Sequence, residues 1–236
     1  IQYLVIEDEP EGIILNTNNQ ASIKRKNSLL RIEQSYNFIL NGLHDVSDND
    51  LICLSDNDEI PNFESRDFKN SKNDIYIFKQ LFFYYKFNLF YDLIPWYGTK
   101  ACKKKKLISL SWLRNLKNKK YPWWRFDTYF SNIKQTNLKI INEGGWHFTN
   151  LKTAEEIFKK LSNFGHHDEF DNSGLTVNHI QNSIDNRVVN YNHLADKSVE
   201  NKYNAQYKLQ LADDKILPKY IVANKEKYKD WFDFQK

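Results

Sequence analysis

The spacing of hydrophobic and polar positions changes several times along the chain, and each spacing predicts an element. Residues 1–7, IQYLVIE, form a continuous β-branched and aromatic run, which is typical of a buried strand. From Ser28 to Leu43, apolar residues recur every three or four positions, which predicts a helix. Residues 51–55 form a second apolar run that ends in acid. We therefore predict a βαβ unit with its function at the carboxyl ends of the strands.

Further along the chain the pattern is less uniform. Residues 74–93 are dense in aromatics, and their periodicity fits a strand or a helix equally well. Residues 107–118 are typical of a helix, and residues 138–148 of a strand that runs into a glycine turn. A capping box, Thr153 to Glu156, predicts a helix over residues 153–161. We expect residues 163–174 to form a polar loop.

The length of 236 residues, with only 5 Pro and 7 Gly, favours one compact α/β domain without a flexible linker. We expect a nucleotide-binding half over about residues 1–100 and an acceptor half over about residues 101–236. No apolar run reaches the ~18 residues of a membrane span. The chain contains no Met and begins abruptly with IQYLVIED, so we expect that N-terminal residues are missing from it.

Composition and charge narrow the classes of ligand. Aromatic residues make up 15% of the chain, enough to provide stacking surfaces for sugars or bases beside the core. The net charge of +4 permits an anionic ligand such as a nucleotide. It falls short of the basic surface that a duplex-DNA binder needs, so we expect no nucleic-acid partner.

The acidic segment SDNDEIP, residues 55–61, raises the question of what compensates its charge. Asp56 and Asp58 are separated by one residue and can face a single cation in a tight turn. Carboxylate oxygens suit Mg²⁺ or Mn²⁺, and such an ion can bridge the two phosphates of a nucleotide. The alternative is a solvated turn, because Asp-x-Asp is a common pattern by itself.

Three other segments carry candidate chemistry. GGWHF, residues 144–148, combines two glycines that allow close backbone approach with a Trp face for sugar stacking, or is a glycine turn beside a core Trp. GHHDEFD, residues 165–171, supplies possible metal ligands and a general base, or is an exposed polar loop. KKKK, residues 103–106, is a solvated face or an attractor for phosphate.

Taken together, these motifs resemble glycosyltransferase family 17, which includes the β-1,4-mannosyl-glycoprotein 4-β-N-acetylglucosaminyltransferases. SDNDEIP is similar to the S-D-x-D-E-I-P signature of that family, and GGWHF to its G-G-W-H-F segment. YLVIE, WYGTK (residues 96–100) and LPKYIVANKEKYKDWF (residues 217–232) resemble further segments, so the resemblance covers nearly the whole chain. It implies a GT-A-like fold with a mixed central sheet flanked by helices, a divalent metal, and inverting transfer from UDP-GlcNAc.

The resemblance also implies roles for single residues. Asp56 and Asp58 match the Asp-x-Asp pair that holds the metal and the donor. Glu7 lies where the first strand meets the nucleotide, and Arg31 matches an Arg of the following helix. Two departures concern that helix and the histidine loop. Ser35 and Tyr36 stand where the family commonly has Gln-Arg, and the loop around residues 166–167 is one residue longer.

An inverting transfer needs a carboxylate that deprotonates the acceptor hydroxyl. The candidates for this base are Glu143, Asp168 and Glu169, with a preference for the later two. His147, His166 or His167 would complete the metal shell, and Trp146 with Gly144 and Gly145 would contact the acceptor. We expect Glu59 to accept hydrogen bonds that hold the loop.

The expected reaction is metal-dependent transfer of GlcNAc from UDP-GlcNAc to a glycan or glycoprotein acceptor, with Mn²⁺ or Mg²⁺ as cofactor. One alternative is a carbohydrate-binding protein on a degenerate transferase fold, and another is a metal-dependent nuclease or phosphohydrolase. The Asn- and Lys-rich composition suggests a cytoplasmic setting in a microbe or a virus-infected host. The Golgi lumen is the alternative if an anchor precedes the chain.

Overall fold

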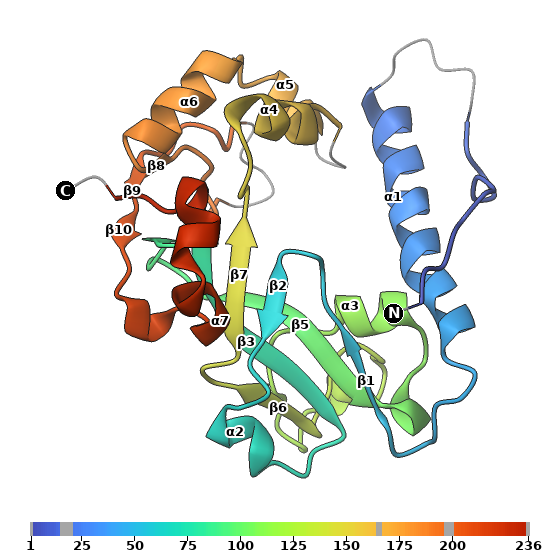
Figure 1. Ribbon diagram of the computed structural model, residues 1–236. Helices are drawn as coiled ribbons and strands as arrows, with labels where there is room; N and C mark the ends of the chain where they lie inside the picture. The colour runs from blue at the N-terminus through green and yellow to red at the C-terminus, as the bar shows by residue number, and fades with distance from the viewer. Residues whose placement is uncertain (1, 15–20, 164–166, 196–200, 235–236) are drawn as a thin grey trace. The chain divides into compact units, whose positions relative to one another are not determined.

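The computed structural model describes residues 2–14, 21–163, 167–195 and 201–234 (Figure 1). The chain is mixed α/β, with a mixed sheet flanked by helices. It divides into two compact units, each built from several stretches of sequence. The first unit comprises Ile1–Asp8, Glu33–Phe82 and Ile94–His147, and the second comprises Glu9–Ile32, Phe83–Leu93 and Phe148–Lys236. The expectation of a single domain stays a prediction.

The first unit holds most of the sheet. Its strands are β1 (Leu51–Leu54), β2 (Glu59–Pro61), β3 (Ile75–Tyr84), β5 (Trp96–Lys103), β6 (Leu138–Ile141) and β7 (Gly145–Thr149), of which β3 and β7 run on into the second unit. Its helices are α2 (Arg66–Lys69) and α3 (Leu110–Asn115), together with the short 3₁₀ turns η1 (Ile39–Gly42), η2 (Lys104–Lys106) and η3 (Phe126–Thr128). Strand β5 pairs antiparallel with β1 and with β3, whereas β6 pairs parallel with β3.

The alternation of side chains along β3 explains how this sheet buries both of its faces. Ile75 and Ile77 pack in one cluster with Leu110, Leu113 and other residues of α3. Tyr76 and Phe78 point the other way and pack with Ala101, Ile141 and Phe68 of α2. The ambiguous segment 74–93 therefore contains strands, β3 and the short β4 (Leu89–Phe90), and the side chains at the start of β3 fill two cores at a period of two.

The second unit is mainly helical. Its helices are α4 (Ala154–Asn163), α5 (His167–Asp171), α6 (Val177–Asp185) and α7 (Lys219–Ala223), with the 3₁₀ turns η4 (Asp214–Ile216) and η5 (Lys225–Trp231). Its strands are β4 (Leu89–Phe90), β8 (Val188–Val189), β9 (Tyr207–Lys208) and β10 (Gln210–Leu211). The capping box at the start of α4 is confirmed: Thr153 N–H donates to Glu156 Oε2 at 3.0 Å, and Glu156 N–H donates to Thr153 Oγ1 at 3.3 Å.

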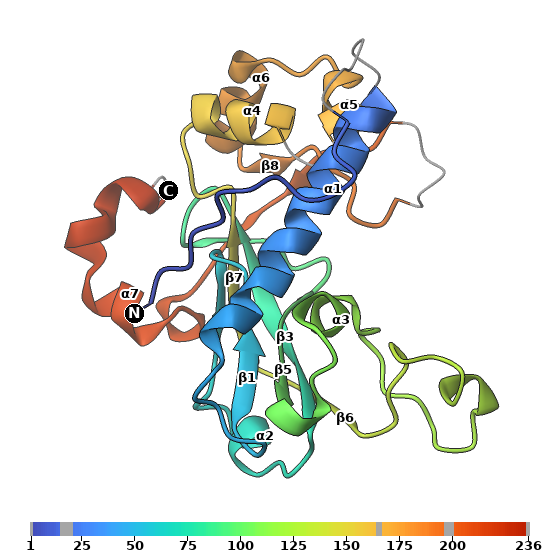
Figure 2. The same cartoon turned by 90° about the vertical axis from the view of Figure 1, so that its right-hand side faces the viewer.

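The predicted helix after residue 28 is confirmed as part of α1 (Ala21–Phe38), which begins earlier and belongs to both units. Figure 2 shows α1 along its length. The loop predicted over residues 163–174 is wrong in part, because residues 167–171 form α5. The predicted strand over residues 51–55 is confirmed as β1, and the helix predicted over residues 107–118 is confirmed, in shorter form, as α3.

The predicted first strand, residues 1–7, is wrong. Its described residues, 2–7, are irregular, with Tyr3 84% and Val5 69% exposed. Leu4 and Ile6 are half-buried, and Leu4 Cδ1 approaches Gly42 closely. An apolar run becomes a strand only where a partner strand accepts its hydrogen bonds, and here contact with η1 covers one side of it instead. The βαβ prediction is wrong for the same reason, and β1 pairs antiparallel with β5.

Among the described residues, no helix is both long and apolar enough to cross a membrane.

Candidate metal and diphosphate site

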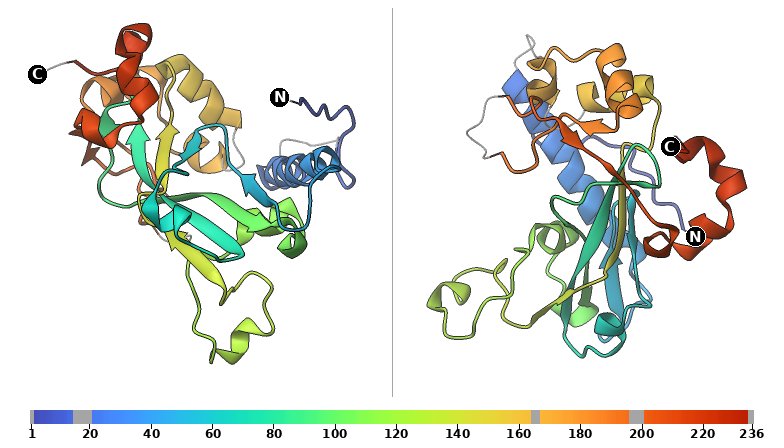
Figure 3. Two further views of the ribbon diagram at one scale, coloured as in Figure 1. Left: turned by 60° about the horizontal axis from the view of Figure 1, so that its bottom comes forward. Right: turned by 90° about the vertical axis from the view of Figure 1, so that its left-hand side faces the viewer.

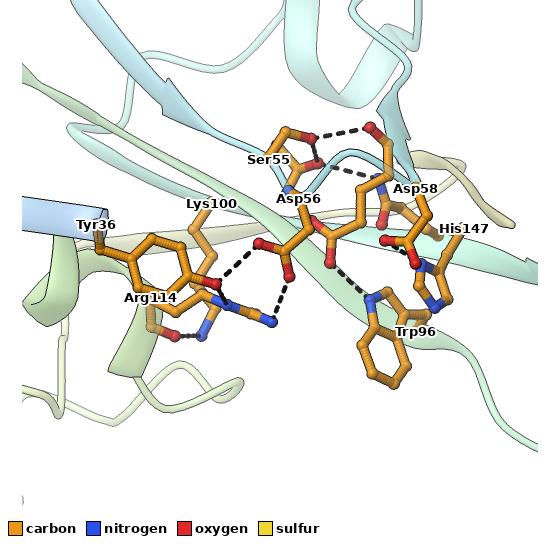
Figure 4. Close-up of polar contacts among 11 residues, drawn as sticks. Tyr36, Ser55, Asp56, Asp58, Trp96, Lys100, Arg114 and His147 are labelled. Carbon is orange, nitrogen blue, oxygen red and sulfur yellow. Dashed lines mark hydrogen bonds and ion pairs between the residues drawn. The ribbon is translucent and has the colours of Figure 1, made fainter. Parts of the chain in front are cut away.

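The acidic segment forms a tight turn between β1 and β2 (Figure 4). Glu59 N–H donates to the Asp56 carbonyl at 3.0 Å and closes the turn. The Ser55 hydroxyl donates to the Glu59 carbonyl at 3.0 Å and lies 2.6 Å from the Thr99 hydroxyl of β5. Hydrogen bonds within the turn and to β5 therefore hold the backbone that carries its carboxylates.

Glu59 supports this turn from inside the protein. Its side chain is buried, and Oε1 accepts a hydrogen bond from Trp96 Nε1 at 2.8 Å. Its Oε2 accepts the backbone N–H of Asp56 at 3.2 Å. Burial raises the pKa of Glu59, and the hydrogen bond from Trp96 acts against that shift. The prediction that Glu59 holds the loop by hydrogen bonds is confirmed.

Asp56 is compensated by protein groups. Oδ2 accepts Nη2 of Arg114 at 2.8 Å, and Oδ1 accepts the Tyr36 hydroxyl at 2.9 Å. Nε of Arg114 also donates to the Tyr36 oxygen at 3.2 Å, so the three side chains form a closed ring of contacts. Burial lowers the pKa of Arg114, but Asp56 and Tyr36 outweigh it and the net pKa is raised. Both oxygens of Asp56 therefore have partners within the chain.

A buried lysine holds the helix that carries Arg114. Lys100 is 4% exposed, and its Nζ donates to the carbonyls of Arg114 at 2.8 Å and Leu116 at 2.6 Å. These carbonyls belong to the end of α3, where helices leave C=O groups without intrahelical partners. Burial, assisted by the charge of Arg114, lowers the pKa of Lys100 to about 8. Lys100 therefore fixes the backbone from which Arg114 reaches Asp56.

Asp58 lies beside a histidine of the next strand. Glu59 of β2 pairs with His147 of β7, and this register brings Oδ1 of Asp58 to 3.6 Å from Nδ1 of His147. The imidazole is 4% exposed and stacks on Trp96 with ring centroids 4.3 Å apart and planes 11° apart. Phe82 also packs against the imidazole, with the two ring centroids 5.0 Å apart. A rigidly packed imidazole thus faces a carboxylate that is still partly open to solvent.

Asp58 and His147 fit a divalent cation as two of its ligands. In an octahedral shell with bonds of about 2.1 Å, neighbouring ligand atoms are roughly 3 Å apart, so small side-chain shifts would bring the pair into position. Mg²⁺ and Mn²⁺ commonly take few protein ligands and complete their shells with water and phosphate oxygens. Within the described ranges, no group of three or more His, Cys, Asp or Glu side chains gathers into a complete metal cage.

The glycines of GGWHF are explained by close backbone packing. Gly145 has φ +119°, and a Cβ there would lie 2.0 Å from the Ile60 carbonyl oxygen. A Cβ on Gly144 would lie 2.7 Å from the backbone nitrogen of Lys79. Trp146 is half-buried on β7, opposite Ile60. These glycines let the β6–β7 turn lie against β2 and β3.

The other predicted residues of the first unit lie apart from Asp58. Glu143 lies in the turn before β7, and its carbonyl accepts a hydrogen bond from Asn62 Nδ2 at 3.1 Å, beyond the end of β2 that is farther from Asp58. Its side chain is exposed, with a backbone φ of 50°. Glu7 is also exposed. Neither residue joins the cluster of Asp56, Asp58 and His147.

The remaining candidates belong to the second unit. Arg31 makes a two-pronged ion pair with Glu9, at 2.8 Å for each hydrogen bond. His167 is buried on α5, and Glu169 accepts Lys202 Nζ at 2.8 Å. Asp168 lies on the same helix, whereas His166 lies outside the described residues. These residues belong to a different unit of the chain from the acidic turn.

Four residues of the site were not predicted as members: Tyr36, Trp96, Lys100 and Arg114. Arg114 is 58 positions from Asp56 and lies in an ordinary helical pattern, so no local signal marks it. The only indication in the sequence is physical, since a carboxylate cluster needs a cation. The chain itself supplies part of this positive charge, through the guanidinium of Arg114.

Comparison of the chain with known protein families, with curated proteins and with solved structures finds no match.

Proposed function

We propose that this chain is a metal-dependent, inverting glycosyltransferase of GT-A-like fold that moves GlcNAc from UDP-GlcNAc to a glycan hydroxyl. The observation that carries the proposal is the pair formed by Asp58 and His147, 3.6 Å apart at the turn after β1. Asp58 belongs to SDNDEIP and His147 to GGWHF, the two motifs that resemble glycosyltransferase family 17. A turn at the end of an apolar strand is a common place for nucleotide ligands.

Asp58 and His147 would hold Mn²⁺ or Mg²⁺, which when bound neutralises charge on the diphosphate as it leaves the sugar. The packing of His147 against Trp96 and Phe82 keeps the imidazole in one orientation, so little ordering cost remains when a ligand binds. Asp58, with 27% of its side chain exposed, stays accessible to the ion.

Arg114 would act on the same diphosphate. Its side chain is 29% exposed, and Asp56 and Tyr36 use only part of its five-donor guanidinium. An oriented guanidinium binds phosphate oxygens well, because its planar donors match their spacing. In this proposal Asp56 orients Arg114 and does not ligate the metal directly, which differs from the role expected from the Asp-x-Asp resemblance.

The general base is proposed among Asp168, Glu169 and Glu143. The preference for Asp168 and Glu169 rests on the polar sequence around them. Single replacement of each carboxylate by its amide distinguishes them. Loss of turnover with unchanged donor affinity identifies the base, because deprotonation of the acceptor contributes to the transition state and not to donor binding.

A non-catalytic carbohydrate-binding protein is the second candidate. The observation that favours it is the closed ring of Asp56, Arg114 and Tyr36, which compensates one carboxylate of the Asp-x-Asp pair without a metal. The two candidates differ in chemistry: a binder retains sugar affinity but leaves UDP-GlcNAc intact.

Incubation with UDP-GlcNAc and Mn²⁺, followed by measurement of released UDP, tests the proposed function. We expect Mn²⁺-dependent release of UDP by the intact chain, loss of that release in Asp58→Ala, and its retention in the control Asp48→Ala. Asp48 is an exposed aspartate just before β1. If UDP is not released by the intact chain with any glycan acceptor or water, or if Asp58→Ala remains fully active, the proposal fails.

A further inference from the structure

Residues 116–137, between α3 and β6, form a loop that extends away from the sheet of the first unit (Figure 3). We call it the aromatic loop. Its exposed rings lie within eight positions of the sequence: Trp123, Trp124, Phe126, Tyr129 and Phe130, with exposures of 74%, 63%, 81%, 73% and 91%. Trp112, only a few positions earlier on α3, is 7% exposed. Clustered exposed rings on a protein surface indicate a contact with another apolar phase or molecule.

The aromatic loop is held in shape by its own contacts. Lys117 N–H donates to the Ile133 carbonyl at 3.0 Å, and Tyr121 N–H donates to the Gln135 carbonyl at 3.1 Å, which joins its two arms. Asp127 pairs with Arg125 and with Lys134, both at 2.6 Å. These contacts leave the large rings outside, so the exposure of the rings follows from the fold of the loop.

The aromatic loop is also positively charged. It contains five basic residues and one acidic residue, and thus carries +4, the net charge of the whole chain. The rest of the chain has 29 basic and 29 acidic residues. Lys117, Lys119 and Lys120 are exposed beside the rings, and Asp127 is already neutralised. The loop therefore combines its exposed rings with a net positive charge, which an anionic surface would attract.

We propose that the aromatic loop docks on an anionic phospholipid surface. Trp and Tyr rings favour the membrane–water interface, Phe rings enter the acyl boundary, and nearby lysines contact the headgroups. The cavity at this loop measures about 180 Å³, below the ~300 Å³ at which ligand pockets begin. A single-stranded nucleic acid would need a groove that follows its backbone, whereas these rings occupy an extended tip. This inference is independent of the proposed function.

Flotation of the full chain with vesicles tests the proposal. We expect binding to vesicles of phosphatidylcholine with phosphatidylserine, little binding to phosphatidylcholine alone, and weakening by salt. Lys119→Ala with Lys120→Ala should weaken binding roughly thirtyfold. Lys227→Ala with Lys229→Ala, two exposed lysines that are flanked by Glu226 and Asp230, is the matched control and should bind as the unchanged chain does.

The contribution of the rings is tested separately. Trp123→Ser with Phe130→Ser should reduce vesicle binding at least tenfold, whereas Tyr3→Ser, which alters another highly exposed ring, should not. Circular dichroism and thermal melting check that each variant is folded. No vesicle binding by the unchanged chain, or loop variants that bind as well as it does, would overturn the proposal. So would a preference for single-stranded DNA or soluble glycan over vesicles.

Discussion

Arg114 and Asp56 lie 58 residues apart in the chain, and their side chains form an ion pair at 2.8 Å. This ion pair compensates one of the negative charges of the acidic turn. Asp56 is compensated by a guanidinium, Glu59 accepts hydrogen bonds from Trp96 and from the Asp56 N–H, and Asp58 faces His147. The three carboxylates therefore have three different surroundings, and Asp58 is the one that we propose as a ligand of an external cation.

Replacement of Arg114 by Met tests this division of roles. The variant loses the ion pair with Asp56, so we expect the free energy of unfolding to fall by about 1–2 kcal/mol, a value reduced by partial solvent exposure. Mn²⁺ affinity should rise, by roughly tenfold, because a positive charge near the ion is removed. Denaturant unfolding and Mn²⁺ titration measure the two effects.

The control for this variant is Arg66→Met, which removes the same charge at an exposed position of α2. It should change neither quantity appreciably. Unchanged Mn²⁺ affinity in Arg114→Met would mean that the guanidinium is remote from the cation.

Gly145 is expected to be irreplaceable for packing reasons. Its φ of +119° disfavours any other residue, and a Cβ would lie 2.0 Å from the Ile60 carbonyl oxygen. Gly145→Ala should destabilise the protein by about 3 kcal/mol or more in urea unfolding. Gly174→Ala is the matched control, because Gly174 has φ +67° and no atom within 4 Å of the Cβ position. It should cost about 1 kcal/mol. Equal costs would contradict the close approach of β7 to β2.

The lowered pKa of Lys100 should make the free energy of unfolding depend on pH. This pKa is about 8 in the folded protein and 10.5 in the unfolded chain, so the unfolded chain binds more protons between these values. The contribution of Lys100 to stability should therefore rise as the pH increases from about 8 to about 10.5, by at most about 3 kcal/mol. Unfolding of the unchanged chain and of Lys100→Met, compared across this range, isolates the effect from tyrosine and cysteine titration.

Below pH 8 the difference between these two proteins should be constant. Lys105→Met, which alters an exposed lysine of η2, should show no such trend. A difference between Lys100→Met and the unchanged chain that stays flat up to pH 10.5 would mean that Lys100 is well solvated.

The parts of the fold that sequence reasoning predicted are those with a local cause. The capping box of Thr153 and Glu156 marks the start of α4, and the apolar spacing after residue 28 marks a helix. The first strand failed because strand formation depends on a partner elsewhere in the chain, which IQYLVIE cannot reveal by itself. Local apolar pattern identifies a buried segment but does not say what buries it.

The site shows the same limit. Asp58 and His147 were predicted, and the register of β2 with β7 brings them together. The roles of Arg114 and Lys100 depend on tertiary contacts between α3, β1 and β5, for which the sequence offers no spacing rule. Asp56, predicted as a metal ligand, has both oxygens bound by Tyr36 and Arg114, and this too follows only from the folded structure.

Calorimetric titration of UDP in the presence and absence of Mn²⁺ is the sharpest test of the proposed metal and diphosphate site. We expect UDP to bind in a Mn²⁺-dependent manner, and Asp58→Asn and His147→Gln each to weaken this binding by at least tenfold. Asp48→Asn should bind as the unchanged chain does. Binding of UDP that is indifferent to Mn²⁺, or that survives both substitutions, would show that Asp58 and His147 do not hold a metal for the diphosphate.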